Sequence, residues 1–411
     1  MAPAIPADEL PSKASHGLDL LAGIIVLDLT GSIAGPYAGQ LLADLGATVV
    51  KIEKPDKGDD CRAWGPPFLG GDSLWHLSVN RNKHSVTLDF SAPEGHALLV
   101  RLVERADVML LNLVAKAQRK LRVDYESLVA LRPDIVHVSI TGFGLEGARA
   151  ELPCYDLIAE GHSGVMDMTG ERESPPQKVG TPAADLLAGQ DAALAAVAAL
   201  FRRQRTGIGA RIDISLVESM TRFMAPRLMS YLGSGDLLRR SGARDSVIAI
   251  YQAFETADEP LTLGLGNDAI WTRFWTAVGE PANAADPAHA TNALRREHRS
   301  ELVAKIAGVL KNKPRDEWLD IFAKARVPAG PINRLDEVGS DTHLRAARFL
   351  YHFERDGVRV PQVGLGIRFD GVSESCAKPP PRLGADNRTV LQGWLGVTDA
   401  ALERLRADGI I

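Results

Sequence analysis

The 411-residue chain has only three cysteines, Cys61, Cys154 and Cys376, and they are far apart. This odd, widely spaced set forms neither a disulfide framework nor a CxxC metal site, and it suits a reducing compartment. The ten histidines show no HExxH or other ligand spacing, so no metal site is expected. The chain also lacks a Gly-x-Ser-x-Gly motif and a Walker loop, so neither a serine hydrolase nor a P-loop protein is indicated.

Basic residues do not outnumber acidic ones: 47 Lys and Arg stand against 52 Asp and Glu, for a net charge of −5. This balance argues against a nucleic-acid binder, which usually carries a basic domain. The most apolar run, Ala192–Phe201, is far shorter than the roughly 20 residues that cross a bilayer. Residues 1–17 carry two acids and three prolines without an apolar core, unlike a secretory signal. We therefore expect a cytoplasmic protein with neither a membrane nor a nucleic-acid partner.

Short apolar runs alternate with helical stretches through the first half of the chain. Ile24–Leu29 is typical of a buried strand, and a glycine-containing turn leads from it to a helix with Pro36 in its first turn. Ala47–Glu53 predicts a second strand, so the three segments form a βαβ unit of a parallel sheet. Further strands are expected at Val86–Leu88, Val108–Leu111 and Ile135–Ile140, and helices at Ala92–Arg105 and Leu186–Arg205.

The pattern changes near residue 225, which indicates a second domain. Ile248–Phe254 and Pro260–Leu265 flank a polar turn and predict an antiparallel hairpin. The predicted organisation is a flexible arm at 1–17, a discontinuous large α/β domain at 18–225 and 331–411, and a smaller α+β domain at 226–330. Further elements complete it: helices at Ala269–Val278, Arg295–Leu310 and Arg315–Ala325, a strand-like Gly366–Phe369, and a final helix.

The first βα turn is a candidate anion site, because glycines let a phosphate approach the N-terminus of a helix. Glu53 at the end of the second strand mimics the ribose-binding acid of NAD enzymes. The spacing, however, is Gly31-x-x-x-Gly35 and not GxGxxG. A βαβ opening that needs glycine for its geometry alone is therefore the favoured alternative, and an NAD-dependent dehydrogenase stays a minor one.

Basic residues gather after the predicted strands, where ligands of open α/β sheets bind. They indicate either a polyanion site, for a nucleotide diphosphate or coenzyme A, or a solvated charged face. The groups are Lys51, Lys54, Lys57 and Arg62; Arg81 and Lys83; and Lys116, Arg119, Lys120 and Arg122.

Asp185 directly precedes the predicted long helix, after Gly180. A carboxylate there can accept hydrogen bonds from the first-turn N–H groups as an N-cap. It can also act as a nucleophile if it is ionised and partly desolvated. The residues alone favour capping, and Asp156 in the loop-rich segment upstream is a second acid nearby.

Seven segments, together with the one around Asp185, resemble the family III CoA-transferases. This family includes formyl-CoA transferase and carnitine CoA-transferase and is related to α-methylacyl-CoA racemase. The segments are LDLTGSIAGPYAGQLLADLGATVVKIEKP (27–55), NRNKHSVTLD (80–89), YDLIAEGHSGVMDMTG (155–170), RTGIGARIDISLVES (205–219), YQAFETAD (251–258), VPAGPIN (327–333) and PPPRLG (379–384).

The resemblance implies a Rossmann-like large domain that binds CoA, a small domain joined by long linkers, and an interlocked homodimer. Asp185 matches the catalytic aspartate, with helix capping as a compatible second role. Its carboxylate would attack an acyl-CoA thioester to give a mixed anhydride, and exchange would continue through an aspartyl-CoA thioester. The expected partners are an acyl-CoA and a carboxylic acid, with coenzyme A as substrate and no tightly bound cofactor.

The resemblance also assigns CoA contacts and an active-site neighbour, Asp156. Lys54 and Lys120 would meet the phosphates. The full set of expected CoA contacts is Ile33, Ala34, Lys54, Leu88, Ser91, Asn112, Leu113, Lys120 and Tyr155.

Two alternatives within this resemblance stay open. An acyl-CoA racemase needs two bases, but the position of its histidine holds Tyr155, a poor base at neutral pH, which favours the transferase. A non-catalytic CoA-binding protein is suggested by residues 112–116, where the family usually has Asn-Phe-Arg-Pro-Gly. Members of the family commonly use succinyl-CoA as donor and a small dicarboxylate or hydroxy acid as acceptor. The acyl donor and acceptor of this protein stay open.

Overall fold

The computed structural model describes residues 10–12, 17–371 and 378–411. The expected arm at 1–17 lies mostly outside them, and within it the carbonyl of Pro11 accepts a hydrogen bond from the backbone N–H of His352. The described residues divide into two compact units. The large unit comprises residues up to 165, 178–234 and those from 339, and the small unit comprises 166–177 and 235–338.

These unit boundaries differ from the predicted domain limits of 226 and 330. Helix α10 (Ala225–Ser234) continues the chain of the large unit beyond residue 226. Strand β11 (Ala329–Pro331) pairs with β10 (Leu261–Gly264), so the chain leaves the small unit after residue 330. Residues 166–177 join the small unit, where the carbonyl of Gly170 accepts a hydrogen bond from the N–H of Gly242.

In the described part of the large unit, six parallel strands form the central sheet in the order β5-β2-β1-β6-β7-β8. In chain order this is 3-2-1-4-5-6, the Rossmann arrangement, whose topological switch point lies between β1 and β6. Burial of the apolar runs of β1, β2, β6 and β7 on both faces explains why these four segments form parallel strands. The strands are β1 (Ile25–Asp28), β2 (Thr48–Glu53), β5 (Lys83–Thr87), β6 (Val108–Leu111), β7 (Val136–Thr141) and β8 (Ala210–Ser215).

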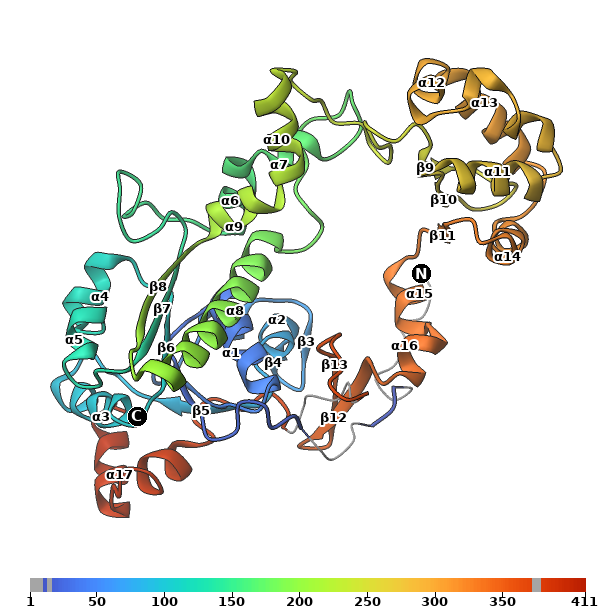
Figure 1. Ribbon diagram of the computed structural model, residues 1–411. Coiled ribbons are helices and arrows are strands. Elements are labelled where there is room, and N and C mark those ends of the chain that lie inside the picture. The colour runs from blue at the N-terminus through green and yellow to red at the C-terminus, as the bar shows by residue number, and fades with distance from the viewer. Residues whose placement is uncertain (1–9, 13–16, 372–377) are drawn as a thin grey trace. The chain divides into compact units, whose positions relative to one another are not determined.

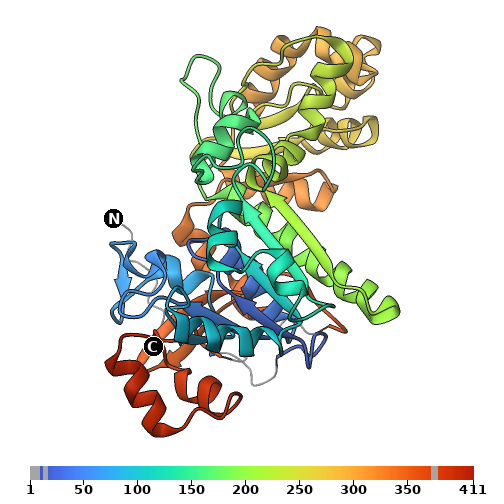
Figure 2. The same ribbon diagram turned by 90° about the vertical axis from the view of Figure 1, so that its left-hand side faces the viewer.

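Helices cover both faces of this sheet (Figure 1). On one face α3 (Pro93–Val103), α4 (Ala115–Leu121) and α5 (Tyr125–Val129) pack with the C-terminal α17 (Asp399–Ala407) around an apolar core. Figure 2 shows the C-terminal segment returning beside α3, where the carbonyl of Ile410 accepts a hydrogen bond from the N–H of Asp89.

The other face holds α1 (Ala34–Asp44) and the long α8 (Ala183–Thr206), which pack closely together. A Cβ at Gly189 of α8 would lie 2.6 Å from the carbonyl oxygen of Ala34, so only glycine permits this approach. Among the described residues, α8 is also long and apolar enough to cross a membrane by length and composition alone, and a little under half of its apolar part is buried in the structure. Its alanines pack on α1 and the sheet, as expected of a core helix.

The remaining elements of the large unit include a hairpin that the sequence analysis missed. Strands β12 (Leu350–Arg355) and β13 (Val358–Val363) pair through an Asp356-Gly357 turn with positive φ at both residues, a turn typical of hairpins. The strand expected at Gly366–Phe369 is wrong, because Gly366 adopts a left-handed conformation with φ +77. The other elements are η2 (Asp60–Ala63), β3 (Phe68–Leu69), β4 (Asp72–Ser73), α2 (Leu74–Ser78), α6 (Asp156–Ser163), α9 (Leu216–Phe223), α16 (Thr342–Ala346) and η5 (Arg388–Gln392), with α7 (Val165–Met168) and α15 (Leu335–Ser340) at the unit boundaries.

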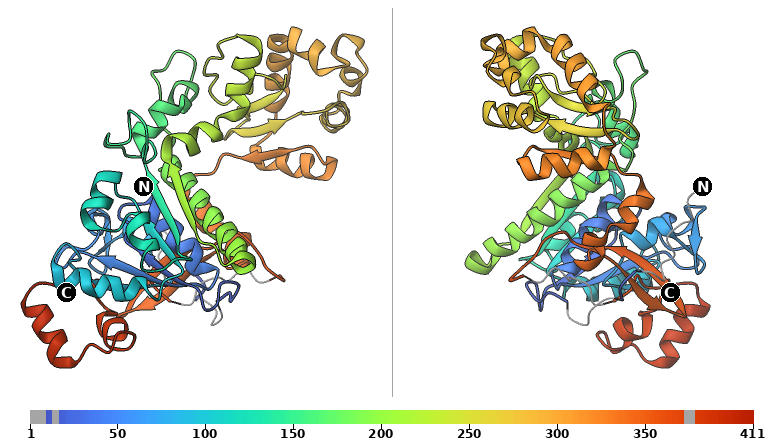
Figure 3. Two further views of the ribbon diagram at one scale, coloured as in Figure 1. Left: turned by 60° about the vertical axis from the view of Figure 1, so that its left-hand side comes forward. Right: turned by 90° about the vertical axis from the view of Figure 1, so that its right-hand side faces the viewer.

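The small unit contains the predicted hairpin, β9 (Tyr251–Phe254) and β10, and β11 extends it into an antiparallel sheet (Figure 3). Aromatic side chains fill its core, with Trp271, Phe274 and Phe322 fully buried. Its helices are α11 (Asp268–Ala277), η3 (Pro281–Ala284), η4 (Pro287–His289), α12 (Asn292–Glu297), α13 (Arg299–Leu310) and α14 (Arg315–Ala325).

The α1–α8 contact predicts the effect of a single methyl group. Gly189→Ala should lower the free energy of unfolding by about 1–3 kcal/mol, because the new Cβ overlaps the backbone of α1. Gly233→Ala in α10 is the matched control, since a Cβ there meets no atom within 4 Å. That control should gain about 0.5–1 kcal/mol from helix propensity. Urea unfolding measures both, and equal stability of the two variants would contradict the close approach.

Candidate active site

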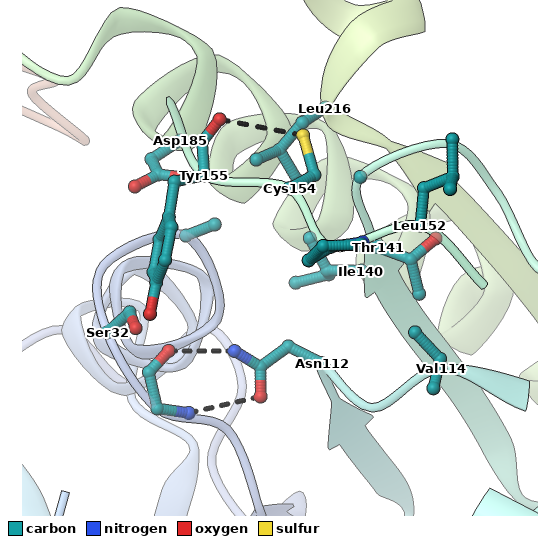
Figure 4. Close-up of a pocket in the computed structure, with 14 residues that line it drawn as sticks. Ser32, Asn112, Val114, Ile140, Thr141, Leu152, Cys154, Tyr155, Asp185 and Leu216 are labelled. Carbon is teal, nitrogen blue, oxygen red and sulfur yellow. Dashed lines mark hydrogen bonds between the residues drawn. The ribbon is translucent and has the colours of Figure 1, made fainter. Parts of the chain in front are cut away.

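A pocket of about 290 Å³ opens at the topological switch point, beyond the carboxyl ends of β1, β6 and β7 (Figure 4). This is where open α/β sheets bind their ligands. Its walls come from the turn after β1, the segment after β6, the end of β7, the loop before α6 and the first turns of α8 and α9. The lining residues are Gly31, Ser32, Ala34, Asn112, Val114, Ile140, Thr141, Gly142, Leu152, Pro153, Cys154, Tyr155, Asp185 and Leu216.

Close packing shapes the turn after β1. A Cβ at Gly35 would lie 2.3 Å from the Cβ of Thr30, so this glycine is required where the turn enters α1. Asn112 binds Gly31 at both ends: Oδ1 accepts from the Gly31 N–H at 3.1 Å, and Nδ2 donates to the Gly31 carbonyl at 2.8 Å. The amide of Asn112 therefore joins the two strands that border the switch point.

Asp185 is the third residue of α8 and does not cap the helix, so the expected capping role is wrong. Asp156, the first residue of α6, supplies the cap. Its Oδ1 accepts hydrogen bonds from the N–H groups of Ala184 at 2.8 Å and Asp185 at 3.3 Å. The carboxylate of Asp185 accepts no hydrogen bond from any described residue, and it lies with Cys154 and Tyr155 in the pocket wall (Figure 4).

The surroundings of Asp185 favour its protonated form. Burial raises the pKa of Asp185 to about 7, and the negative charge of Asp156 adds to the effect. Near neutral pH the group is thus partly ionised and poorly solvated, as suits a carboxylate nucleophile. Behind this pair, burial also raises the pKa of Glu160, whose carboxylate accepts the N–H of Val179 at 2.9 Å.

Cys154 is a free thiol in the same wall, as Cys61 is in the core, and Cys376 lies outside the described residues. Burial and then the charge of Asp185 raise the pKa of Cys154 to about 11, so it stays a thiol at neutral pH. Its Cβ would lie 2.0 Å from a Cβ at Gly142, which explains the glycine at the end of β7. Across the described ranges, no group of three His, Cys, Asp or Glu residues is placed to hold a metal ion.

Comparisons with known proteins identify the family. The family model of CoA-transferase family III matches residues 21–387. A succinate–glutarate CoA-transferase of Agrobacterium fabrum is 38% identical over 90% of this chain and 94% of its own length. The succinyl-CoA:glutarate CoA-transferase of Mus musculus is 34% identical over 98% of this chain and 92% of its own length. A CAIB/BAIF family protein from Brucella suis has the same fold, with a TM-score of 0.81 and 36% identity over 92% of this chain and 100% of that one.

The chain belongs to CoA-transferase family III. It is an enzyme of the CoA-transferase class, as the resemblance predicted. The switch-point pocket lies in the large unit of this enzyme.

The structure brings only part of the expected CoA-transferase site together. Ala34, Asn112, Tyr155 and Asp185 line the pocket, and Asp156 lies directly behind Asp185. The side chains of Ile33 and Leu88 are buried in the core, and the N–H and carbonyl of Leu88 are already hydrogen-bonded to Glu53 and Phe90. The remaining residues lie outside the pocket: Leu113 half-buried against the core, and Lys54, Ser91 and Lys120 exposed at the surface.

Sequence reasoning missed several pocket residues, among them Ser32, Thr141, Cys154 and Leu216. Ser32 and Thr141 stand at or just beyond the ends of parallel strands, and that position was the available signal. Cys154 and Leu216 carried no signal, because tertiary packing brings their segments to the pocket.

The basic groups divide into buried and exposed members. Four side chains pair with carboxylates inside the large unit: Lys51 with Asp59, Lys83 with Asp28, Arg62 with Glu53, and Arg81 with Asp44. A polyanion role for these four is therefore wrong, and Glu53 is engaged by Arg62 and not free for a ribose. The exposed members are Lys54, Lys57, Lys116, Arg119, Lys120 and Arg122.

The environment of Asp185 predicts a titration near neutral pH. A water-soluble carbodiimide reacts with protonated carboxyl groups, so modification of Asp185 should fall as the pH rises through about 7. Asp156→Asn removes the neighbouring charge but keeps an acceptor for the Ala184 N–H, and should lower the midpoint by about one pH unit. Peptide mass spectrometry measures the modification. An unchanged midpoint in the variant would contradict the assigned coupling.

Proposed function

We propose that the enzyme transfers CoA from an acyl-CoA to a carboxylic acid, with Asp185 as the covalent nucleophile. The observation that carries this proposal is the carboxylate of Asp185, which lacks a hydrogen-bond partner among the described residues and lines the switch-point pocket. Two supports are independent of this geometry: the residue matches the catalytic aspartate of the resembled family, and the chain belongs to that family.

In the first half-reaction, an Asp185 carboxylate oxygen attacks the thioester carbonyl of the donor. The C–S bond breaks and CoA leaves as its thiolate, giving a mixed aspartyl-acyl anhydride. The thiolate then attacks the aspartyl carbonyl and expels the donor carboxylate, which leaves an aspartyl-CoA thioester. The anhydride keeps the acyl group activated, which explains why the chemistry uses a carboxylate.

In the second half-reaction, the acceptor carboxylate attacks the aspartyl-CoA carbonyl and expels the CoA thiolate. The thiolate attacks the acceptor side of the new anhydride, which releases the product acyl-CoA and regenerates Asp185. No net proton is consumed when both acids are ionised. The thiol of Cys154, with its pKa raised to about 11, does not compete for the thioester at neutral pH.

Small dicarboxylic acids are the proposed substrate class. Two relatives aligned over most of this chain are named for succinate or succinyl-CoA and glutarate. The pocket of about 290 Å³ offers room for a short acyl chain beside Asp185. The exposed Lys54 and Lys120 would meet the CoA phosphates, in line with the resemblance.

We further propose that the enzyme is an interlocked homodimer. The large unit exposes large apolar side chains along and next to α8, including Leu194, Phe201 and Ile208, which are 68%, 61% and 63% accessible. Burial of these side chains against a second copy would remove them from water.

Sedimentation or light scattering tests the dimer. The particle should have twice the 44.2 kDa mass of the chain and should not dissociate on dilution, because interlocked chains separate only on unfolding. A monomer at micromolar concentration would contradict the proposal.

Substitution of Asp185 tests the transferase mechanism. With succinyl-CoA and glutarate, Asp185→Ala and Asp185→Asn should lower kcat by more than about a thousandfold, because neither side chain can form the anhydride. Asp191→Asn is the matched control on the same helix, where Asp191 accepts a hydrogen bond from Ser219 at 2.7 Å and pairs with Arg222. Its kcat should stay within about threefold.

The racemase alternative predicts a different outcome. A wild-type enzyme that transfers no CoA between any tested acids, but exchanges the α-hydrogen of a branched acyl-CoA in deuterated water, would contradict the transferase proposal. Among the described residues that line the pocket there is no histidine, and the position of the racemase histidine holds Tyr155.

A further inference from the structure

Side chains form hydrogen bonds with five of the six polar backbone atoms of residues 30–32, the turn after β1. Within the described residues, Asp28 accepts the Thr30 N–H at 3.0 Å, and Lys51 donates to the Thr30 carbonyl at 2.7 Å. Asn112 holds the N–H and carbonyl of Gly31, as described above. Asp59 accepts the Ser32 N–H at 2.9 Å. These side chains come from β1, β2, the segment after β6 and the residue before η2, so the turn is tied to four parts of the unit.

The charges behind the turn form one continuous network. The Nζ of Lys51 lies 2.9 Å from Oδ2 of Asp59, and both side chains are almost completely buried. Asp59 is itself fixed, because its N–H donates to Oε1 of Glu53 at 3.1 Å, and Glu53 pairs with Arg62. Burial would lower the pKa of Lys51, but the attraction of Asp59 and other carboxylates outweighs it and raises that pKa, so Lys51 stays charged.

Stability alone is a weak reason for such a network. Charges taken out of water lose hydration, and a buried ion pair often contributes no more to stability than apolar residues of similar volume. The turn it fixes is unusual, since Ser32 has a φ of +69, a conformation that residues with a Cβ seldom adopt. Gly31, Ser32 and Ala34 form the wall of the pocket that Asp185 also lines.

We propose that Asp59 is a positioning residue for the reaction: by holding the Ser32 N–H, it fixes the wall against which the thioester must lie for attack by Asp185. This inference rests on the proposed function. It gives the buried basic residue Lys51 a role, since its charge holds Asp59 in place rather than binding a ligand.

Two substitutions at Asp59 separate positioning from stability. Asp59→Ala and Asp59→Asn both remove the charge that faces Lys51, so both should lower the melting temperature. Only Asp59→Ala removes Oδ1, the acceptor for the N–H groups of Ser32 and of Cys61 in η2, and loss of the Cys61 hydrogen bond is read by the melting temperature. Asp44→Asn is the control, because the Asp44–Arg81 pair, at 2.6 Å, is equally buried and does not touch the turn.

The experiment measures release of succinate in a single turnover at saturating succinyl-CoA without an acceptor acid, with thermal unfolding in parallel. Asp59→Ala should slow release about tenfold or more, since small misplacements of reacting groups have effects of this size. Asp44→Asn should stay within about threefold of the wild type despite its lower stability. Asp59→Asn should lose less than Asp59→Ala, because it can keep an acceptor for the Ser32 N–H, but only with its amide NH₂ against the Lys51 ammonium. This pattern, with activity following the acceptor and not the melting temperature, would support the inference.

Two other results would contradict the positioning role of Asp59. Wild-type rates in Asp59→Ala, or losses in all three variants that follow their melting temperatures, would overturn the positioning role while leaving the proposed function intact. A wild-type enzyme that releases no succinate from succinyl-CoA would overturn the proposed function, and this inference with it.

Discussion

The close approach of α8 to α1, which the missing side chain of Gly189 permits, is the contact on which the pocket depends. It brings the first turn of α8 beside the turn that leaves β1, so that Asp185 and residues 31–34 line one pocket. The Rossmann strand order places this junction at the switch point between β1 and β6. Asp156 caps the N-terminus of α8, so the carboxylate of Asp185 does not bind the N–H groups of the helix.

Electrostatics separates Asp185 from the other buried carboxylates of the large unit. Burial would raise the pKa of Glu53, but Arg62 and Lys51 outweigh it and lower the pKa to about 2. Asp185 is half-buried in the pocket wall, its charged neighbour is Asp156, and its pKa rises to about 7. Similar carboxyl groups in one unit thus receive opposite environments: Glu53 is held ionised as part of the scaffold, and Asp185 is left poorly solvated in the pocket wall with a raised pKa.

Much of the architecture could be predicted, because strand periodicity and turn residues are local signals. The runs at Val108–Leu111 and Arg315–Ala325 became elements with the same limits. Strand β8 went unpredicted, since its alternating ARIDIS pattern differs from the continuous apolar runs of the other strands. The Asp-Gly turn between β12 and β13 is a local signal of the same kind, and it marks a hairpin that was not predicted.

The site could be predicted less fully, because it depends on pairings between distant residues. Resemblance pointed to Asp185, but not to the fact that Asp156 caps its helix. The basic residues after the strands looked alike in the sequence, although Lys51 is buried against Asp59 and Lys54 is exposed. Composition and spacing do not distinguish a buried ion pair from an anion-binding side chain, since that difference arises from tertiary packing.

The most direct test of the central claim is mass spectrometry of the peptide that carries Asp185, after incubation with succinyl-CoA and trapping with hydroxylamine. The account predicts a hydroxamate at Asp185 that depends on the acyl-CoA and is absent from Asp185→Ala. An active enzyme that transfers CoA while Asp185 stays unmodified under all trapping conditions would contradict it.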